Sequence, residues 1–467
     1  MLFLNLALTA ACVAAAGVFD VTAYGGRGDG TTLNTAAFAA AVSAAHAFYE
    51  STGAQGTVLA PAGVYLSGQI VLLSGVVLSV APAARLLASA SPHDYPADPG
   101  RWAFLFSENA VDIGITGGGV VDGQFEAYIG GFNATNDEYV FKGWPNCAGE
   151  CRPRLCMLTN SAHIVVSSVS FVGSPDWTFH LLNTTYVHVF NWTQFGDERW
   201  PNNDGIDIDS SSHVLLENST INTADDGVCI KGSTPNGTSV NVTVRNVRVR
   251  SRSSAIKYGS NIPIPMSGHL FEDVHIWDSN RGLAIQARDG GSLRDITFRR
   301  ILINGTRFWP WKWWGDGGPL YISSMLRDAA DTGTLISNVL FEDIDAVAQN
   351  AAVLSGVAPG KPLRNITLRR VRLHVARVGN YSVSSVTAPS IEYDPHVSGV
   401  PSRVNMTGWM PGLYAEAVEG LTLEDVNISF DQADPQGYWG RVCANTTRVG
   451  FPMRVVGGSC VPPPGGP

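Results

Sequence analysis

The sequence predicts an all-β chain folded as a single-stranded parallel β-helix, a solenoid in which each coil of short strands stacks on the coil before it. From about residue 112 onward, short segments alternate apolar and polar residues with a period of two, as half-buried strands do. Most successive segments lie about 23–28 residues apart, which is typical of solenoid repeats. The 50 glycines suit a fold with many tight turns. These observations favour repeated coils over a single conventional core.

The predicted strands share an alternating pattern and often come in close pairs. Val169–Phe171, for example, follows two residues after a longer segment. Many short strands would also suit an antiparallel sandwich, but the internal repetition favours the β-helix, in which each coil covers its neighbour. The main predicted segments are His163–Val166, His188–Phe190, His213–Leu216, Val240–Val244, His269–Phe271, Asp295–Phe298, Asn338–Phe341, Asn365–Leu368 and Leu421–Leu423.

The N-terminal part of the mature chain predicts a capping helix. Within Asn34–Tyr49, the residues Phe38, Val42 and Ala45 recur at helical spacing. An uncapped solenoid end exposes core and strand edges, so we expect this helix to cover the first coil. Residues 17–467 are then one β-helix domain, because each repeat needs only its neighbours for support.

Two intervals are longer than one coil and predict loops that project from the solenoid, where function tends to concentrate. One is Trp309–Asp316, which is rich in tryptophan, and the other runs from about Arg377 to Met410. The tryptophans either form a wall on which sugar rings stack or plug the side of the solenoid.

The first 16 residues read as a signal peptide. Leu2–Val13 is almost wholly apolar, and Ala14–Ala16 resembles a small-residue cleavage site, although a buried N-terminal helix is an alternative. Twelve Asn-x-Ser/Thr sequons indicate a glycoprotein. We therefore expect a secreted protein of the extracellular space or the cell wall. No later apolar run reaches membrane-spanning length.

The cysteines agree with an oxidising compartment. Six of the seven remain once the signal peptide is removed, an even number that suits disulfides. Cys443 and Cys460 form the most natural pair. The cluster Cys147, Cys151 and Cys156 could hold another bridge.

Composition excludes some partners. The formal net charge is −9 and no run of Lys or Arg occurs, which argues against nucleic acid. No phosphate-cradling glycine loop and no convincing metal-ligand cluster is present, so we expect neither a cofactor nor a metal. We also expect no membrane partner and a monomeric chain.

Two acidic clusters carry the functional signal. The first is Asn202–Asp209 and the second is Asp225-Asp226-Gly227. Asp204 and Asp225 are 225 − 204 = 21 residues apart, about one coil, and residues one coil apart stack roughly 4.8 Å from each other. We therefore expect Asp204, Asp225 and Asp226 to meet on one face. Paired acid and base carboxylates are what hydrolysis of a glycosidic bond needs, whereas the alternative is that these Asx-Gly segments are only turns.

The other Asp and His residues near these clusters are predicted to have no part in the catalytic step. Asp207 and Asp209 alternate with isoleucines, so both should face outward. We expect Asp207 to line the site and Asp209 to be a solvated or turn-binding group. His180 and His188 are treated as ordinary polar residues.

The chain resembles the polygalacturonase-like glycoside hydrolases (family 28), which have right-handed, pectin-lyase-like parallel β-helices. The resemblance covers most of the mature chain. The motifs that carry it are Phe19–Gly25, Arg152-Pro153-Arg154, Ser174–Trp177, Asn202–Asp207 and Asp225–Lys231. It implies that Asp225 is the general acid, and that Asp204 and Asp226 activate a water on the opposite face, which inverts the anomeric configuration. A separation of roughly 6.5–9.5 Å between acid and base carboxyls is expected for inversion.

Two departures from the family pattern concern substrate recognition. Ser254 stands where pectin-cleaving members carry a histidine, and Ala284 and Gln286 replace the Arg and Lys that hold a substrate carboxylate. Arg or Lys is the natural partner for a uronate carboxylate. Homogalacturonan is therefore expected to be a poor substrate, unless another cation has taken over this role. The candidate substrate-binding residues are Asn202, Asp207, Lys231, Lys257 and Arg281, with Arg288 as a further cation.

The sequence thus favours a secreted inverting hydrolase of pectin or a related acidic or branched cell-wall polysaccharide. One alternative is a catalytically silent β-helix that binds such a polymer, which the missing histidine and cations would favour. Another is a polysaccharide lyase, which needs a base and a neutralising cation or calcium. The clustered acidic residues without adjacent basic residues argue against a lyase.

Overall fold

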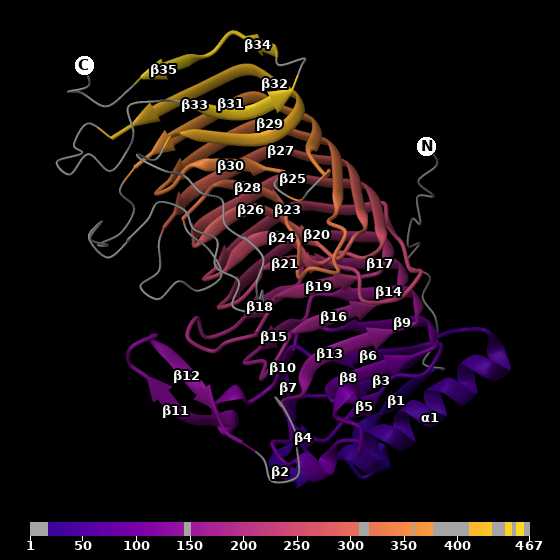
Figure 1. Cartoon of the computed structure of the whole chain (residues 1–467). Helices are drawn as coiled ribbons and strands as arrows, with labels where there is room; N and C mark the ends of the chain where they lie inside the picture. The colour runs from indigo at the N-terminus through magenta and orange to yellow at the C-terminus, as the bar shows by residue number, and fades with distance from the viewer. Residues whose placement is uncertain are drawn as a thin grey trace.

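The computed structural model describes residues 17–143, 151–307, 317–356, 358, 360–376, 411–431, 444–450 and 454–461 of the 467-residue chain. Figure 1 shows strands stacked in parallel coils from one end of the molecule to the other, with a helix at the N-terminal end. The fold is a right-handed parallel β-helix, as the sequence predicted.

One ladder of parallel strands positions the acidic clusters, and we call it the site ladder. Each of its strands pairs in parallel with the strand of the next coil. Its members are β5 (Ile70–Val71), β8 (Ala103–Glu108), β13 (Arg154–Thr159), β16 (Phe179–Leu182), β19 (Ile206–Asp209), β21 (Val228–Lys231), β24 (Ser254–Asn261), β26 (Arg281–Arg288), β28 (Leu320–Ser324), β30 (Ala352–Ser355) and the first part of β32 (Leu413–Phe430).

A second ladder runs the length of the solenoid, and a third covers its N-terminal half. The second contains β1 (Val18–Asp20), β3 (Gly56–Ala60), β6 (Val76–Val80), β9 (Val111–Thr116), β14 (Ala162–Ser167), β17 (Thr185–Phe190), β20 (Ser212–Thr223), β23 (Val242–Ser251), β25 (Pro265–Ser279), β27 (Ser292–Thr306), β29 (Leu335–Ala348) and β31 (Leu363–Val375). The third contains β2 (Asp29–Leu33), β4 (Gly63–Ser67), β7 (Ala84–Ala88), β10 (Val120–Asp122), β15 (Ser170–Val172) and β18 (Thr193–Phe195).

The remaining elements are short. An antiparallel hairpin is formed by β11 (Ile129–Asn133) and β12 (Glu138–Phe141). The strand β22 (Ser239–Val240) pairs with β25, while β33 (Ala444–Gly450), β34 (Arg454–Val456) and β35 (Ser459–Val461) pair with β32. Four 3-10 turns are η1 (Val21–Tyr24), η2 (Pro92–Asp94), η3 (Pro99–Arg101) and η4 (Phe125–Tyr128).

From β20 onward, the predicted pairs of short strands merge into single long strands. The predicted segment Val240–Val244 is therefore too short, since β23 continues without a break to Ser251. Asn246 lies within β23 with φ +50°, and Asn218 lies likewise within β20. Asn tolerates this left-handed conformation better than most residues, so one residue turns the strand while the ladder pairing continues.

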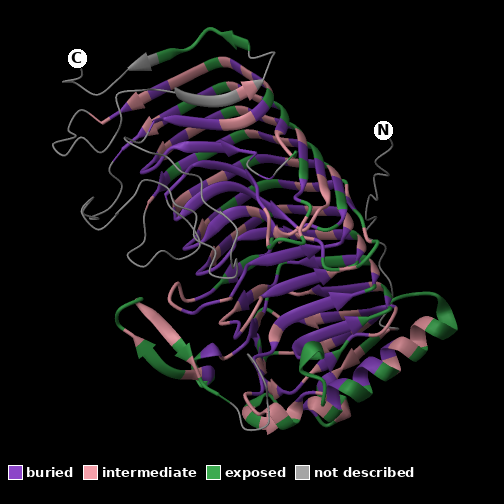
Figure 2. Ribbon diagram, viewed as in Figure 1, coloured by how far each residue is buried: buried purple, intermediate pink, exposed green. Residues whose placement is uncertain are grey.

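The interior of the solenoid is filled by apolar side chains. Figure 2 shows buried residues along the strands of successive coils. Phe271, Phe298 and Phe341 occupy equivalent positions on successive coils, with ring centroids 4.9 and 5.1 Å apart. The predicted capping helix is α1 (Thr35–Thr52), which buries Phe38 and Val42 and packs against the first coils.

Some predictions concern residues that the structure does not describe. Residues 1–16, Trp309–Asp316, the interval Arg377–Met410 and the side chains of the Cys443–Cys460 pair lie outside the described part. In the cysteine cluster, Cys151 is disulfide-bonded. Cys156 is a free, buried thiol, so it does not belong to a bridge of that cluster. None of the helices described has the length and apolar character needed to cross a membrane.

Candidate active site

The strands β19 and β21 bring the two acidic clusters together. Ile206 pairs with Val228, so Asp204 and Asp226, each two residues earlier, lie at the same level of adjacent coils. The coil interval is therefore 226 − 204 = 22 residues, and the predicted direct stacking of Asp204 on Asp225 is wrong by one residue. The three carboxylates nevertheless meet, since one oxygen of each lies within 4.8 Å of one another.

Two glycines allow this close approach of the coils. A Cβ atom on Gly205 would collide with the carbonyl oxygen of Gly227, and one on Gly227 would collide with the Val249 side chain and the Ala255 carbonyl oxygen. The Asp-Gly pattern of both clusters thus has a packing reason. It lets the aspartates of neighbouring coils face one another.

Asn203 holds the Asp225-Asp226 turn in place, a role that the sequence did not reveal. Its side chain is buried, and Oδ1 accepts hydrogen bonds from the backbone N–H of Ala224 at 2.8 Å and of Asp225 at 3.3 Å. Its Nδ2 donates to the Asp197 carbonyl oxygen at 3.0 Å. The only signal in the sequence was its position beside Asp204.

Asn202, predicted to bind substrate, links the general-acid candidate to a buried arginine. Its Nδ2 donates to Asp225 Oδ2 at 3.4 Å, and its Oδ1 accepts from Arg152 Nη2 at 3.0 Å. Arg152 is fixed in turn by the carbonyl oxygens of Pro175 and Pro201, at 2.7 and 3.0 Å. Arg152 therefore anchors the site and is not available to grip a ligand.

The two predicted lysines pair with carboxylates of the site. Lys231 Nζ lies 2.7 Å from Asp207 Oδ1 and 3.4 Å from Asp204 Oδ2. Lys257 Nζ lies 2.7 Å from Asp226 Oδ2. Only about 12% of each lysine side chain is exposed. Both lysines are therefore engaged within the protein, and neither is available to bind a substrate carboxylate.

The environment separates the protonation states of the three central carboxyls. Burial, together with the charges of Asp204 and Asp226, raises the pKa of Asp225 well above its usual value. Burial also raises the pKa of Asp204 to about 6, although Lys231 opposes this rise. For Asp226, burial is outweighed by Lys257 and Lys231, so its pKa is lowered. At mildly acidic pH the cluster therefore contains a proton donor, Asp225, and an ionised base, Asp226.

Two aspartates expected to face solvent are instead buried. Asp207 and Asp209 do alternate with core isoleucines, but their exposed fractions are 0% and 1%. Burial raises the pKa of Asp207 despite its partner Lys231. Asp209 accepts from the backbone N–H of Ser233 at 2.6 Å and lies 3.4 Å from His180 Nε2. Of the two alternatives for Asp209, the solvated group is wrong because the neighbouring coils cover this row, while the hydrogen bond to Ser233 fits a group that binds a turn.

His180 is also more than an ordinary polar residue. It is buried against Asp209, and its ring lies edge-on to Trp177 with centroids 5.0 Å apart. Burial lowers its pKa to about 4, so it is neutral near neutral pH. His188, by contrast, is a half-exposed residue that pairs with Glu217 at 2.8 Å.

The departures from the family pattern lie on the two coils after Asp226, Ser254 on β24 and the pair Ala284 and Gln286 on β26. Ser254 is fully buried, and its backbone N–H donates to Asp226 Oδ1 at 3.3 Å. Ser253 Oγ donates to the same oxygen at 2.8 Å, a contact not foreseen from the sequence. Arg281 is buried, with its guanidinium 4.4 Å from the centroid of the Tyr321 ring. Arg288, on the same strand, is also fully buried.

The carboxylates lie close together, since one oxygen of each of the three groups is within 4.8 Å of the others. The expected separation of roughly 6.5–9.5 Å refers to whole carboxyl groups and stays a prediction. Separation by itself therefore does not indicate which anomer is formed.

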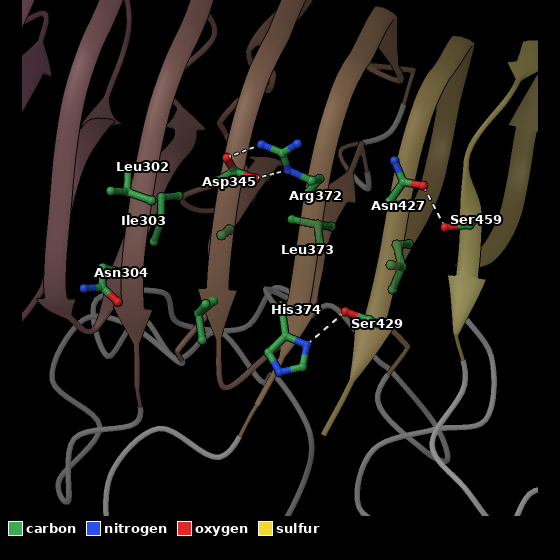
Figure 3. A pocket seen from close by; sticks show the side chains of 13 residues that line it. Leu302, Ile303, Asn304, Asp345, Arg372, Leu373, His374, Asn427, Ser429 and Ser459 are labelled. Atoms are coloured by element: carbon green, nitrogen blue, oxygen red, sulfur yellow. Dashed lines mark hydrogen bonds and ion pairs between the residues drawn. The ribbon is translucent and has the colours of Figure 1, made fainter. Parts of the chain in front are cut away.

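A cavity of about 390 Å³ lies elsewhere, over the outer side of β27, β29, β31 and β32 (Figure 3). It contains none of the predicted site residues. Several of its polar side chains are paired with one another, as in Arg372 with Asp345 and His374 with Ser429. We therefore assign the chemistry to the buried carboxylates on β19 and β21.

Three close carboxyl groups on a parallel β-helix suit the hydrolysis of O-glycosyl bonds. The family model for glycosyl hydrolases family 28 matches residues 51–389, and the chain belongs to this family. It is a polygalacturonase-like hydrolase, and a silent binding protein is not favoured.

Relatives of several kinds support this assignment. A probable polygalacturonase of Vitis vinifera is 29% identical over 382 residues, which cover 76% of this chain and 73% of the relative. An endo-polygalacturonase of Pectobacterium carotovorum subsp. carotovorum is 24% identical over 66% of this chain and 77% of its own. The solved structure of a hyperthermoactive exopolygalacturonase from Thermotoga maritima is similar in fold, with a TM-score of 0.67, 19% identity and coverage of 88% and 91%.

Proposed function

We propose that this protein is a secreted, inverting hydrolase of pectin or a related acidic cell-wall polysaccharide. The observation that carries the proposal is the split in protonation among the three buried carboxyls. Asp225 keeps its proton because of burial and like charges, while Asp226 stays ionised beside Lys257. A protonated carboxyl and an ionised one on the same face are the acid and the base that hydrolysis of a glycosidic bond requires.

In this mechanism the Asp225 carboxyl donates its proton to the glycosidic oxygen as the C–O bond to the leaving sugar breaks. Asp226, assisted by Asp204, takes a proton from the attacking water, whose oxygen forms the new bond to the anomeric carbon. The products are two sugar chains, one with a new reducing end. Lys257, in contact with Asp226, and Lys231 hold the base ionised and transfer no proton themselves.

The class of substrate is proposed from the relatives and from the site. The curated relatives include polygalacturonases of plants and bacteria. In this chain Ala284 and Gln286 replace the family cations, and Lys231 and Lys257 are paired internally. Unsubstituted homogalacturonan should thus be cleaved less readily than a branched or partly neutral pectic polymer. The chain is further proposed to act as a monomer, without nucleic acid or membrane partners.

The test is a screen of wild type, Asp225→Asn and the control Asp273→Asn against a panel of plant and microbial polysaccharides. Asp273 is an exposed aspartate outside the site. New reducing ends should appear with wild type and with the control, and be almost absent with Asp225→Asn. Unsaturated products would indicate elimination, and no product from any polymer would contradict the proposed activity. Secretion is tested by the N-terminus of the mature protein, which should begin after Ala16.

A further inference from the structure

Arg154 is a cation of the site ladder that has no acidic partner among the residues described. Its guanidinium carbon lies 4.8 Å from the centroid of the Trp177 ring. Its Nη1 contacts only the sulfur of Met157, at 3.5 Å, which is a weak acceptor. Its Nε is buried without a hydrogen-bond partner. The guanidinium therefore pairs with no carboxylate among the residues described, and its partly exposed end can bind an anionic ligand.

The register places Arg154 in line with the catalytic carboxylates. Cys156 pairs with Phe179 of β16, and Phe179 pairs with Ile206 of β19. The residues two positions earlier, Arg154, Trp177 and Asp204, therefore occupy one row on successive coils. At roughly 4.8 Å per coil, Arg154 lies about 10 Å before Asp204. A polysaccharide that follows the solenoid axis would reach both residues.

The other described cations near the carboxylates are already engaged. Lys231 and Lys257 form ion pairs with aspartates, and Arg152 donates to backbone carbonyls and to Asn202. Arg281 is 2% exposed and lies on the Tyr321 ring. Arg154, only partly buried, is thus the cation of this row that remains able to bind a carboxylate.

On the opposite side of the carboxylates, the strand β26 offers neutral groups in place of a cation. There, Ala284 and Gln286 occupy β26, and both arginines of that strand are buried. An amide can donate to sugar hydroxyls but offers no charge. The two sides of the carboxylates therefore differ, with a cation on the β13 side and neutral groups on the β26 side.

We propose that Arg154 binds the carboxylate of a uronate unit in a subsite on Trp177, two coils before Asp204, and that the β26 side takes a neutral or esterified sugar. The proposal rests on the proposed function and specifies its substrate. The planar guanidinium fork binds a carboxylate through two parallel hydrogen bonds, while the stack on Trp177 fixes its plane. Arg154 is a specificity-determining residue and takes no part in proton transfer.

The test measures binding separately from hydrolysis. Isothermal titration with Asp225→Asn, which holds substrate intact, compares an oligogalacturonide with its fully methyl-esterified form of equal length. Adding Arg154→Gln should weaken binding of the free acid by roughly ten- to a hundredfold, the usual loss for a hydrogen bond to a charged group. Binding of the ester should be almost unchanged. Arg154→Lys, which keeps the charge, should restore part of the affinity.

Arg248→Gln is the matched control, since Arg248 also lies over a tryptophan, 5.3 Å from the Trp277 centroid, but on β23 of another ladder. This control should bind both oligomers as the parent does. Equal loss on acid and ester would show that Arg154 only supports packing and would overturn the proposal. If wild type released no reducing ends while the difference between acid and ester persisted, the proposed hydrolysis would fail and the subsite would stand.

Discussion

In two rows of this solenoid, charged residues of successive coils stack on one another. One row pairs opposite charges, and the other brings like charges together. On an outer edge of the second ladder, acidic and basic residues alternate from coil to coil in unbroken register, and we call this row the outer ladder. Its members are Glu217, Arg245, Glu272, Arg299, Glu342, Arg369 and Glu424. On the site ladder, the register instead places Asp204 beside Asp226.

The consequence for protonation follows from the neighbours. In the outer ladder, Arg245 lies 2.7 Å from Glu217 and Arg299 lies 2.6 Å from Glu272. These arginines outweigh the burial of both glutamates and lower their pKa values. In the site, like charges meet in a buried place, and the pKa values of Asp204 and Asp225 are raised. Catalysis is thus assigned to the coils where regular charge pairing is interrupted.

The sharpest contrast between the rows is expected from removing one carboxyl in each. Asp225→Asn keeps the shape of the side chain but removes the transferable proton, so kcat should fall by roughly 10²–10⁴-fold. Glu272→Gln in the outer ladder should leave kcat unchanged. Initial rates on the polymer identified by the screen provide the measurement. Near-wild-type activity of Asp225→Asn would contradict the claim that the site carries catalysis and the outer ladder does not.

Breaking the Lys257–Asp226 pair should affect both stability and pH dependence. Lys257→Met leaves Asp226 buried without its partner, which typically costs roughly 3–5 kcal/mol at neutral pH. Lys257 lowers the pKa of Asp226, so its loss raises that pKa. Because the base must be ionised, the acidic limb of the pH–rate profile should move to higher pH. Lys257→Arg is the control that keeps the charge, and an unmoved acidic limb in Lys257→Met would contradict the assignment.

The meeting of like charges in the site should also make the stability of the fold depend on pH. The pKa of Asp204 is raised from 3.8 to about 6 by burial, so the folded protein holds this proton more tightly than the unfolded chain. Stability is then lost as pH rises from about 4 to above 6, by roughly 3 kcal/mol for this carboxyl. Asp204→Asn should lack this loss. Urea unfolding at pH 4 and pH 7 measures it, and identical pH dependence in both proteins would refute it.

The smallest expected effect is a small loss of folding stability when an ion pair of the outer ladder is removed. Arg299→Gln removes a partly exposed pair with Glu272, and such pairs contribute about 0.2–1 kcal/mol. The destabilisation should shrink further in high salt because exposed charges are screened. Thermal unfolding at low and high salt is the measurement. A loss of several kcal/mol would show that the outer ladder is as critical as the site.

The sequence was sufficient for the fold and for bringing the acidic clusters together, because period-two alternation and coil spacing are local patterns. It missed the register by one residue, since spacing between motifs includes turn residues that do not pair. Alternation correctly gave the side on which Asp207 and Asp209 lie, but not that Lys231 and the neighbouring coils cover them. The roles of Lys257 and Asn203 depend on contacts between coils, which single-chain patterns do not reveal.

The sequons illustrate how turn chemistry can resemble another signal. Six of the ten sequon asparagines that lie in the described residues have positive φ, and Asn is favoured in that conformation. These are Asn183, Asn191, Asn218, Asn236, Asn241 and Asn365. The density of sequons is thus partly a product of the β-helix itself, and glycosylation stays a prediction for peptide mapping.

The central claim is that Asp225 donates a proton while Asp226 and Asp204 direct a water to the anomeric carbon. Proton NMR of the first-formed product, recorded before mutarotation, tests it most directly. Direct attack by water predicts a reducing end with the configuration opposite to that of the cleaved bond. A product that retains the original configuration would mean that one aspartate acts as a nucleophile, and would contradict this account.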